Sequence, residues 1–304
     1  MFFLVKYLVR LWRERQAAST AKAPRSERRT PSPRFASPGR SAAARGPLAL
    51  LLHQTGFDIR TSLRNPRARF MTFIFPIVFL VVFNGVFGNG HTRIDGARVS
   101  LKVFYVPGIL AMSIVVTAYA GLVISISSLR ETGVLKRRRA TPVPPAVLIA
   151  GQALATVAVA AVMSVILLVI AKVAYGVGLS AAAVAAVACT ALLGTLTFAC
   201  LGYAVSGLIG SPEAAQPIVQ ATMLPLWFIS GVFIPVTNLS SGLKHVAAVF
   251  PVQPLANSLH LASIHSSFSA ALSGTDLLVL AAWALGAGAF AAWRFSWLPS
   301  AAAA

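Results

Sequence analysis

The chain has 304 residues, of which 57% are hydrophobic and only 11% are charged, and its mean hydropathy is +0.77. Soluble globular domains carry about 25% charged residues, so this composition excludes an ordinary soluble domain. The net charge of +19 comes mainly from residues 1–70 and 130–139, which flank long apolar runs. This arrangement is typical of a membrane protein rather than of a nucleic-acid-binding surface.

The amino-terminal part is basic and poor in core-forming residues. Residues 17–47 are rich in Ala, Ser, Pro and Arg and contain no Leu, Ile or Val. We therefore predict that residues 1–47 form a disordered cytoplasmic tail, whose charge either contacts anionic lipid headgroups or is simply solvated. Residues 48–69 mix apolar and basic side chains, which predicts an amphipathic interfacial helix that turns at Asn65-Pro66 into the first span.

Six apolar runs follow, and each is long enough to cross about 30 Å of hydrocarbon. The sequence predicts an all-α integral membrane protein whose six-span domain covers residues 70–297, with spans at 70–87, 103–129, 146–171, 179–209, 214–236 and 276–293. Residues 237–275 are apolar but interrupted by Pro251 and Pro254. A broken backbone must be sheltered by protein, so we expect short re-entrant helices at the outer interface here.

The basic residues predict the orientation of these spans. Clusters of Arg and Lys precede the first span and follow the second, whereas the opposite ends carry only a sparse set, namely Arg93, Arg98, Lys102 and Lys244. By the positive-inside rule both termini are expected in the cytoplasm, with residues 89–102 and 237–275 outside the inner (plasma) membrane.

The loop between spans two and three is the most informative stretch. Residues 129–152 read LRETGVLKRRRATPVPPAVLIAGQ. They resemble the signature loop of type-2 ABC transporter permeases, and the matching residues are Arg130, Glu131, Gly133, Leu135, Lys136, Arg137, Ala140, Thr141 and Pro142. FISGVFIP at 228–235, followed by Phe250-Pro251, and the Asn65-Pro66 turn into an aromatic first span are also similar to this family. Drug and antibiotic exporters are the subtypes most resembled.

The resemblance implies the membrane-spanning permease subunit of an ABC exporter, acting as a homodimer or with a paired permease. A separate ABC ATPase subunit would bind ATP and Mg²⁺, and the chain indeed contains no G-x-x-x-x-G-K-[ST] phosphate loop. We therefore expect no catalytic, metal or cofactor site, and hence no enzyme activity, in this chain.

The resemblance also implies that the loop couples the permease to the ATPase. The implied coupling residues are Arg130, Glu131, Gly133, Lys136, Arg137, Arg139, Thr141 and Pro142, with Glu131 pairing with nearby basic residues. The alternative interpretation is that Lys136–Arg139 only anchor the loop in the cytoplasm.

Two further groups of residues are candidates for the transport pathway. Gln216 and Gln220 lie one helical turn apart and either line a pathway or form helix–helix hydrogen bonds. Phe228, Gly231, Phe233 and Pro235 are expected to form an outer gate, the two rings packing between protomers or else facing lipid. The transported compound is expected to be a small amphiphile. An ATP-independent carrier or channel is the alternative function, and a membrane scaffold is a third.

Overall fold

The computed structural model describes residues 47–133, 145–265 and 267–294, all within the unit Arg45–Ala304. The predicted tail therefore lies outside the described residues, apart from Pro47. In chain order the elements are α2 (Pro47–Arg64), α3 (Pro66–Arg69), η1 (Phe70–Ile74), α4 (Phe75–Phe87), β1 (His91–Ile94), β2 (Ala97–Ser100), α5 (Leu101–Val115), η2 (Val116–Ala120), α6 (Gly121–Glu131), α8 (Pro145–Tyr175), α9 (Ala181–Ser206), α10 (Pro212–Ile229), η3 (Val236–Asn238), α11 (Ser241–Val249), α12 (Val252–Ile264) and α13 (Gly274–Arg294).

Five of the described helices are long and apolar enough to cross a membrane. They are Pro66–Phe87, Leu101–Glu131, Val147–Tyr175, Ala181–Ser206 and Gly274–Trp293. Each coincides, to within a few residues, with one of the six spans predicted from the sequence. The chain is thus a helical, multi-pass membrane protein.

The remaining predicted span, 214–236, corresponds to α10, which is not among these five helices. α10 ends at Ile229 and not at residue 236, because Ser230 leaves the helical conformation and Gly231 adopts a φ of +79°. Polar residues inside α10, among them Gln216 and Gln220, also lower its hydropathy. The span predicted here was therefore too long.

The helix Leu101–Glu131, made of α5, η2 and α6, lies at the centre of the bundle. Of its most apolar window 78% is buried, against 17% for Pro66–Phe87, because α4, α8, α9, α10 and α12 all pack around it. Its middle turn, η2, is a π-helix, and so is η1 in the first span. The two wide turns contact each other.

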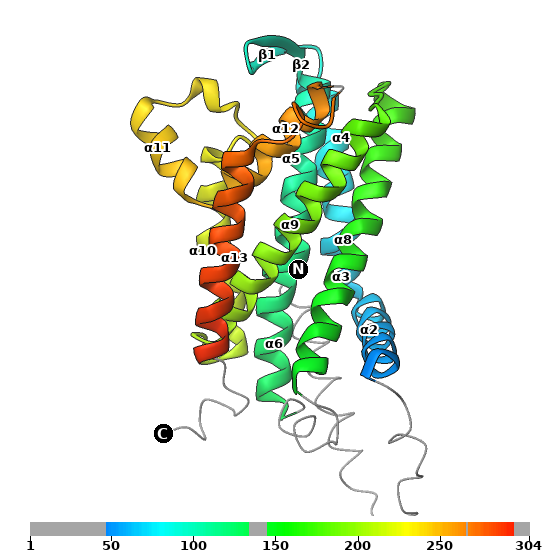
Figure 1. The fold of residues 1–304 in the computed structure, drawn as a ribbon, viewed down its shortest axis with the longest axis vertical. Helices are drawn as coiled ribbons and strands as arrows, with labels where there is room; N and C mark the ends of the chain where they lie inside the picture. Colours follow the sequence, from blue (N-terminus) through cyan, green and yellow to red (C-terminus); the bar gives the residue numbers. More distant parts are fainter. Residues whose placement is uncertain (1–46, 134–144, 266, 295–304) are drawn as a thin grey trace, which may run out of the picture. The chain divides into compact units, whose positions relative to one another are not determined.

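The connection between the first two spans is a β-hairpin, which the all-α prediction missed. β1 and β2 pair antiparallel, with His91 opposite Ser100 and Arg93 opposite Arg98. The turn residues Asp95 and Gly96 have φ of 48° and 78°, as a type I′ hairpin turn requires. We call the end of the bundle that carries this hairpin the hairpin end, and the end at which α6 stops the loop end (Figure 1).

Residues 236–265 form three short helices, η3, α11 and α12, and α11 and α12 lie at the hairpin end (Figure 1). Side chains hold α11 and α12 to the longer helices. Trp283 Nε1 in α13 donates to the carbonyl of Val249 at 2.8 Å, and Asn257 Nδ2 in α12 donates to Asp276 Oδ2 at 2.6 Å. Residues 89–102 and the short helices thus share one end, as the sequence predicted.

Candidate functional site

A cavity of about 850 Å³ opens at the hairpin end. The hairpin, α4, α5, the end of α10 and the segment after it contribute its walls. The lining residues are Phe83, Phe87, His91, Thr92, Arg93, Arg98, Leu101, Tyr105, Phe228, Phe233, Ile234, Pro235, Thr237 and Asn238. Three of the four residues predicted as an outer gate, Phe228, Phe233 and Pro235, are therefore in this wall. Such a volume lies within the range of small-molecule binding sites.

An aromatic cluster forms one side of the cavity. The Phe233 ring stacks on Phe83, with ring centres 5.0 Å apart, and also contacts Phe79 and Phe228 at 5.7 Å each. Phe83 in turn meets Tyr105 of α5 edge-on at 5.1 Å. Offset and edge-on contacts of this kind are favourable ring arrangements.

The two rings of the predicted gate have different environments. Phe233 is only 8% exposed because Phe79, Phe83 and Trp227 of the same chain surround it. Phe228 is 50% exposed. The structure thus packs Phe233 mainly against rings of its own chain and leaves Phe228 accessible.

The backbone after α10 explains the other two gate residues. Gly231 is needed for its positive φ, and Pro235 precedes the short helix η3. The chain approaches this segment closely at Gly108 of α5, where a Cβ atom would lie 2.5 Å from the carbonyl oxygen of Val232. Gly108 therefore lets the segment 230–235 pack directly on the central helix.

We predict that Gly108→Ala destabilises the protein by about 1–3 kcal/mol, because the new methyl group meets a backbone oxygen that cannot rotate away. Gly121→Ala is the matched control in the same continuous helix, since its Cβ meets nothing closer than 3.6 Å. The control should be neutral, or more stable by up to about 1 kcal/mol from helix propensity. Tryptophan-fluorescence melting in detergent measures both, and equal melting midpoints would contradict the packing argument.

At the hairpin itself, arginines and one acid are close together. Arg93 and Arg98 are directly opposite each other, and both line the cavity. Asp95 at the tip contacts Nε2 of His265, the residue after α12, at 3.4 Å from Oδ2. The hairpin tip is therefore linked to the short helices, and its one carboxylate lies outside the cavity lining.

His260 links α12 to the first turn of α5. Its ring is buried and contacts the tilted ring of Phe104, with ring centres 4.6 Å apart. Its Nε2 lies 3.1 Å from the Phe104 carbonyl, and its Nδ1 lies near the carbonyl of Ala256. Burial lowers the pKa of His260 to about 4, although both carbonyls act in the opposite direction. At neutral pH the ring is uncharged and donates to one of these oxygens.

Arg130, the first residue of the predicted coupling set, is buried at the loop end. It is 6% exposed, and its guanidinium donates to the carbonyls of Ser206 and Ile209, the latter at 3.1 Å. Ser206 is the last residue of α9, so Arg130 satisfies carbonyl groups that the end of a helix leaves without partners. We call this arrangement the arginine clamp.

The next coupling residues lie at the surface. Glu131 is exposed, and among the described residues it forms no salt bridge. Gly133 has a φ of +68° and donates its N–H to the Arg130 carbonyl, which ends α6. The remaining coupling residues, Lys136, Arg137, Arg139, Thr141 and Pro142, lie outside the described residues.

The two glutamines of α10 also differ from each other. Gln216 Oε1 accepts a hydrogen bond of 2.8 Å from Arg67 Nη2 of α3, whereas Gln220 is exposed one turn further on. Gln216 therefore joins α10 to the start of the first span, in line with the helix–helix interpretation.

Sequence reasoning missed three parts of this site: the hairpin arginines as a facing pair, the tie through His260 and the contact at Gly108. The Asp95-Gly96 turn is a sequence signal that could have revealed the first. Among the described residues, no three His, Cys, Asp or Glu side chains are close enough to hold a metal ion.

Comparison with known protein families finds a match for this chain. The family model described as ABC-2 type transporter matches residues 55–261, which is more than half of the chain. The match includes the central helix, the arginine clamp and every residue that lines the cavity. No curated protein matches the chain significantly.

Proposed function

The chain belongs to the ABC-2 type transporter family, and from this membership we propose that it is the permease of an ABC exporter that pairs with a second permease and a separate ATPase. The observation that carries the proposal is the family match over residues 55–261. It makes the chain an ABC transporter permease, and export of small amphiphiles is the activity of the subtypes that its signature loop resembles.

In the proposed orientation the loop end faces the cytoplasm and the hairpin end faces outward, in the inner (plasma) membrane. Arg60, Arg64, Arg67 and Arg69 of α2 and α3 supply the positive charge on the cytoplasmic side. α10 is the sixth crossing in this proposal. Its 18 residues span about 27 Å at 1.5 Å per residue, close to the roughly 30 Å of a hydrocarbon core.

Cysteine labelling tests the crossing of α10. In a background lacking Cys189 and Cys200, single cysteines at Glu213 and Ala140 should react with an impermeant maleimide only after cells are permeabilised. Cysteines at Ser241 and Ala97 should react in intact cells, because they lie at the hairpin end. If positions 213 and 241 label alike, α10 does not cross and the six-span arrangement is wrong.

For a dimer, we propose that the pathway runs between two permeases with the cavities near its outer end. Phe228, half exposed beside the cavity, is then the ring that meets the partner, and Phe233 supports it from behind. Gln220, exposed on α10, is the polar candidate for the pathway itself.

Copurification tests the complex. A tagged chain extracted in mild detergent is expected to carry a second copy with a different tag and a subunit that contains a phosphate-binding loop and hydrolyses ATP. An unrelated multi-pass protein with the same tag is the control. Transport by the isolated chain, without nucleotide and without any such subunit, would refute the proposal in favour of an ATP-independent carrier or channel.

A further inference from the structure

We infer that the cavity at the hairpin end binds an amphiphile with an anionic group, such as a phosphate, sulfonate or carboxylate, held by Arg93 and Arg98. The apolar body of this ligand then lies on the aromatic wall. The role of this ligand as a transported substrate rests on the proposed function, whereas its binding to the cavity does not.

The first observation is the placement of the two arginines. They are cross-strand partners in the hairpin register, and both line the cavity. Like charges directly opposite each other destabilise a strand pair, and an anion between them removes that repulsion. Guanidinium groups also provide paired N–H donors that match the oxygen atoms of such an anion.

The second observation is the missing counter-charge within the cavity. None of the residues that line it, all of them in the described part of the chain, is acidic. Asp95, the acid nearest in sequence, does not line the cavity and contacts Nε2 of His265 at 3.4 Å. The remaining polar lining residues include Thr92, Thr237 and Asn238, which add hydrogen-bond donors rather than negative charge.

The third observation is the aromatic part of the cavity wall. Phe83, Phe87, Tyr105 and Phe228 line the same cavity. Phe87 and Phe228 are 48% and 50% exposed, so their ring surfaces are accessible to a ligand. A charged rim beside an aromatic wall matches a molecule that is anionic at one end and apolar at the other.

Two matched fluorescent probes test this binding on the purified full chain in phosphatidylcholine nanodiscs. The anionic probe is 8-anilinonaphthalene-1-sulfonate, and the neutral probe is N-phenyl-1-naphthylamine, which has the same rings without the sulfonate. Signal from empty nanodiscs is subtracted. The anionic probe is expected to saturate, and its affinity should fall about tenfold in the double variant Arg93→Gln/Arg98→Gln, the loss expected for a charge-assisted hydrogen bond.

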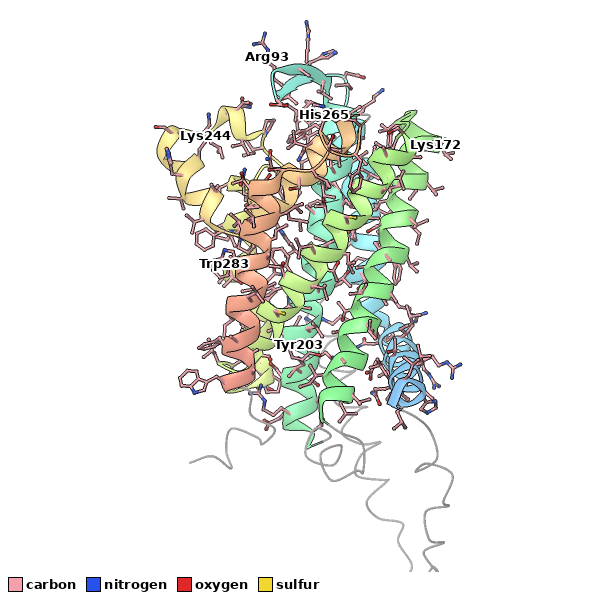
Figure 2. The ribbon with its side chains drawn as sticks, viewed as in Figure 1. Arg93, Lys172, Tyr203, Lys244, His265 and Trp283 are labelled. Carbon is pink, nitrogen blue, oxygen red and sulfur yellow. The ribbon has the colours of Figure 1, made fainter. Side chains whose placement is uncertain are left out.

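The control for charge is Lys244→Gln, which removes a positive charge at the same end of the bundle but outside the cavity (Figure 2). It should leave both probes unaffected. The control for the apolar wall is Phe268→Ala, an exposed ring at the hairpin end that does not line the cavity. Phe228→Ala should weaken both probes, whereas Phe268→Ala should weaken neither.

Unchanged affinity of the double arginine variant for the anionic probe would overturn the inference, as would an equal loss with Lys244→Gln. Retained binding of the neutral probe shows that the double variant keeps its wall folded.

Replacing part of the phosphatidylcholine by phosphatidylglycerol identifies the source of the anion. Competition with the probe assigns the cavity to a lipid headgroup, and lack of competition assigns it to a free amphiphile. The permease alone is measured, so failure to find an ATPase partner does not affect the result.

Discussion

Removal of the basic side chains of Lys136, Arg137 and Arg139 together, or of Glu131 alone, is expected to reduce substrate-dependent stimulation of the partner ATPase roughly 5- to 150-fold, the range of a typical coupling free energy. The reason is that Glu131 is the last residue of the central helix, the three basic residues come shortly after it, and all four belong to the loop that resembles the family's signature. Insertion and melting behaviour should remain normal, because Glu131 is exposed.

The control removes charge from the same side of the membrane without touching the loop. Arg60→Gln/Arg64→Gln in α2 neutralises two exposed arginines at the loop end. If Lys136, Arg137 and Arg139 only anchored the loop in the cytoplasm, both sets of variants would leave ATPase stimulation normal. Arg130 and Arg138 would remain in the loop variants and would still anchor it. Normal ATPase stimulation in the loop variants, measured after reconstitution with the partner, would refute their coupling role.

Arg130→Ala is expected to have the larger structural effect, a loss of about 2–4 kcal/mol in stability together with loss of transport. Its removal leaves the carbonyls of Ser206 and Ile209 buried without their donors. Arg130→Lys keeps the charge but has a single donor nitrogen, so it should recover only part of the stability. The melting midpoint in detergent measures this, with exposed Arg60→Ala as the control.

The predictions for Arg130 and Glu131 assign different roles to two neighbouring residues of one motif. Arg130→Ala should lower both the melting midpoint and transport, whereas Glu131→Ala should lower transport alone. An Arg130→Ala protein that melts like the wild type would show that the arginine clamp contributes nothing to stability, and Arg130 would then rejoin Glu131 as a coupling residue.

The spans could be predicted because each is a local property of the chain. Runs such as 103–129 are apolar and uncharged, so they give a helix of spanning length wherever they pack. α10 was harder to predict, since its end depends on the left-handed backbone at Gly231, which lies within an otherwise apolar run. The hairpin was missed because two four-residue strands are a weak signal beside runs of twenty apolar residues.

The candidate site could be predicted only where its parts are contiguous. Phe228, Phe233 and Pro235 were recognised together because they lie within one short segment, and the structure places all three in the cavity wall. Phe83 and Tyr105 belong to other helices, so their contact with that segment required the fold. The arginine clamp could not be predicted for the same reason. Its acceptors are backbone carbonyls 76 and 79 residues further along the chain, and the side-chain pattern does not indicate them.

The π-helical turn at Val116–Ala120 determines the position of Arg130, which lies ten residues after the end of this turn. A π-helical turn holds one residue more than an α-helical turn, so every residue after it is rotated by about 100° from where a regular helix would place it. Arg130 reaches Ser206 from that rotated position. The position of Arg130 around the helix axis is thus set inside the bundle, at Val116–Ala120, where the central helix touches the matching wide turn of the first span. A change of Val116–Ala120 to regular α-helix would therefore rotate Arg130 about the helix axis, away from the carbonyl of Ser206.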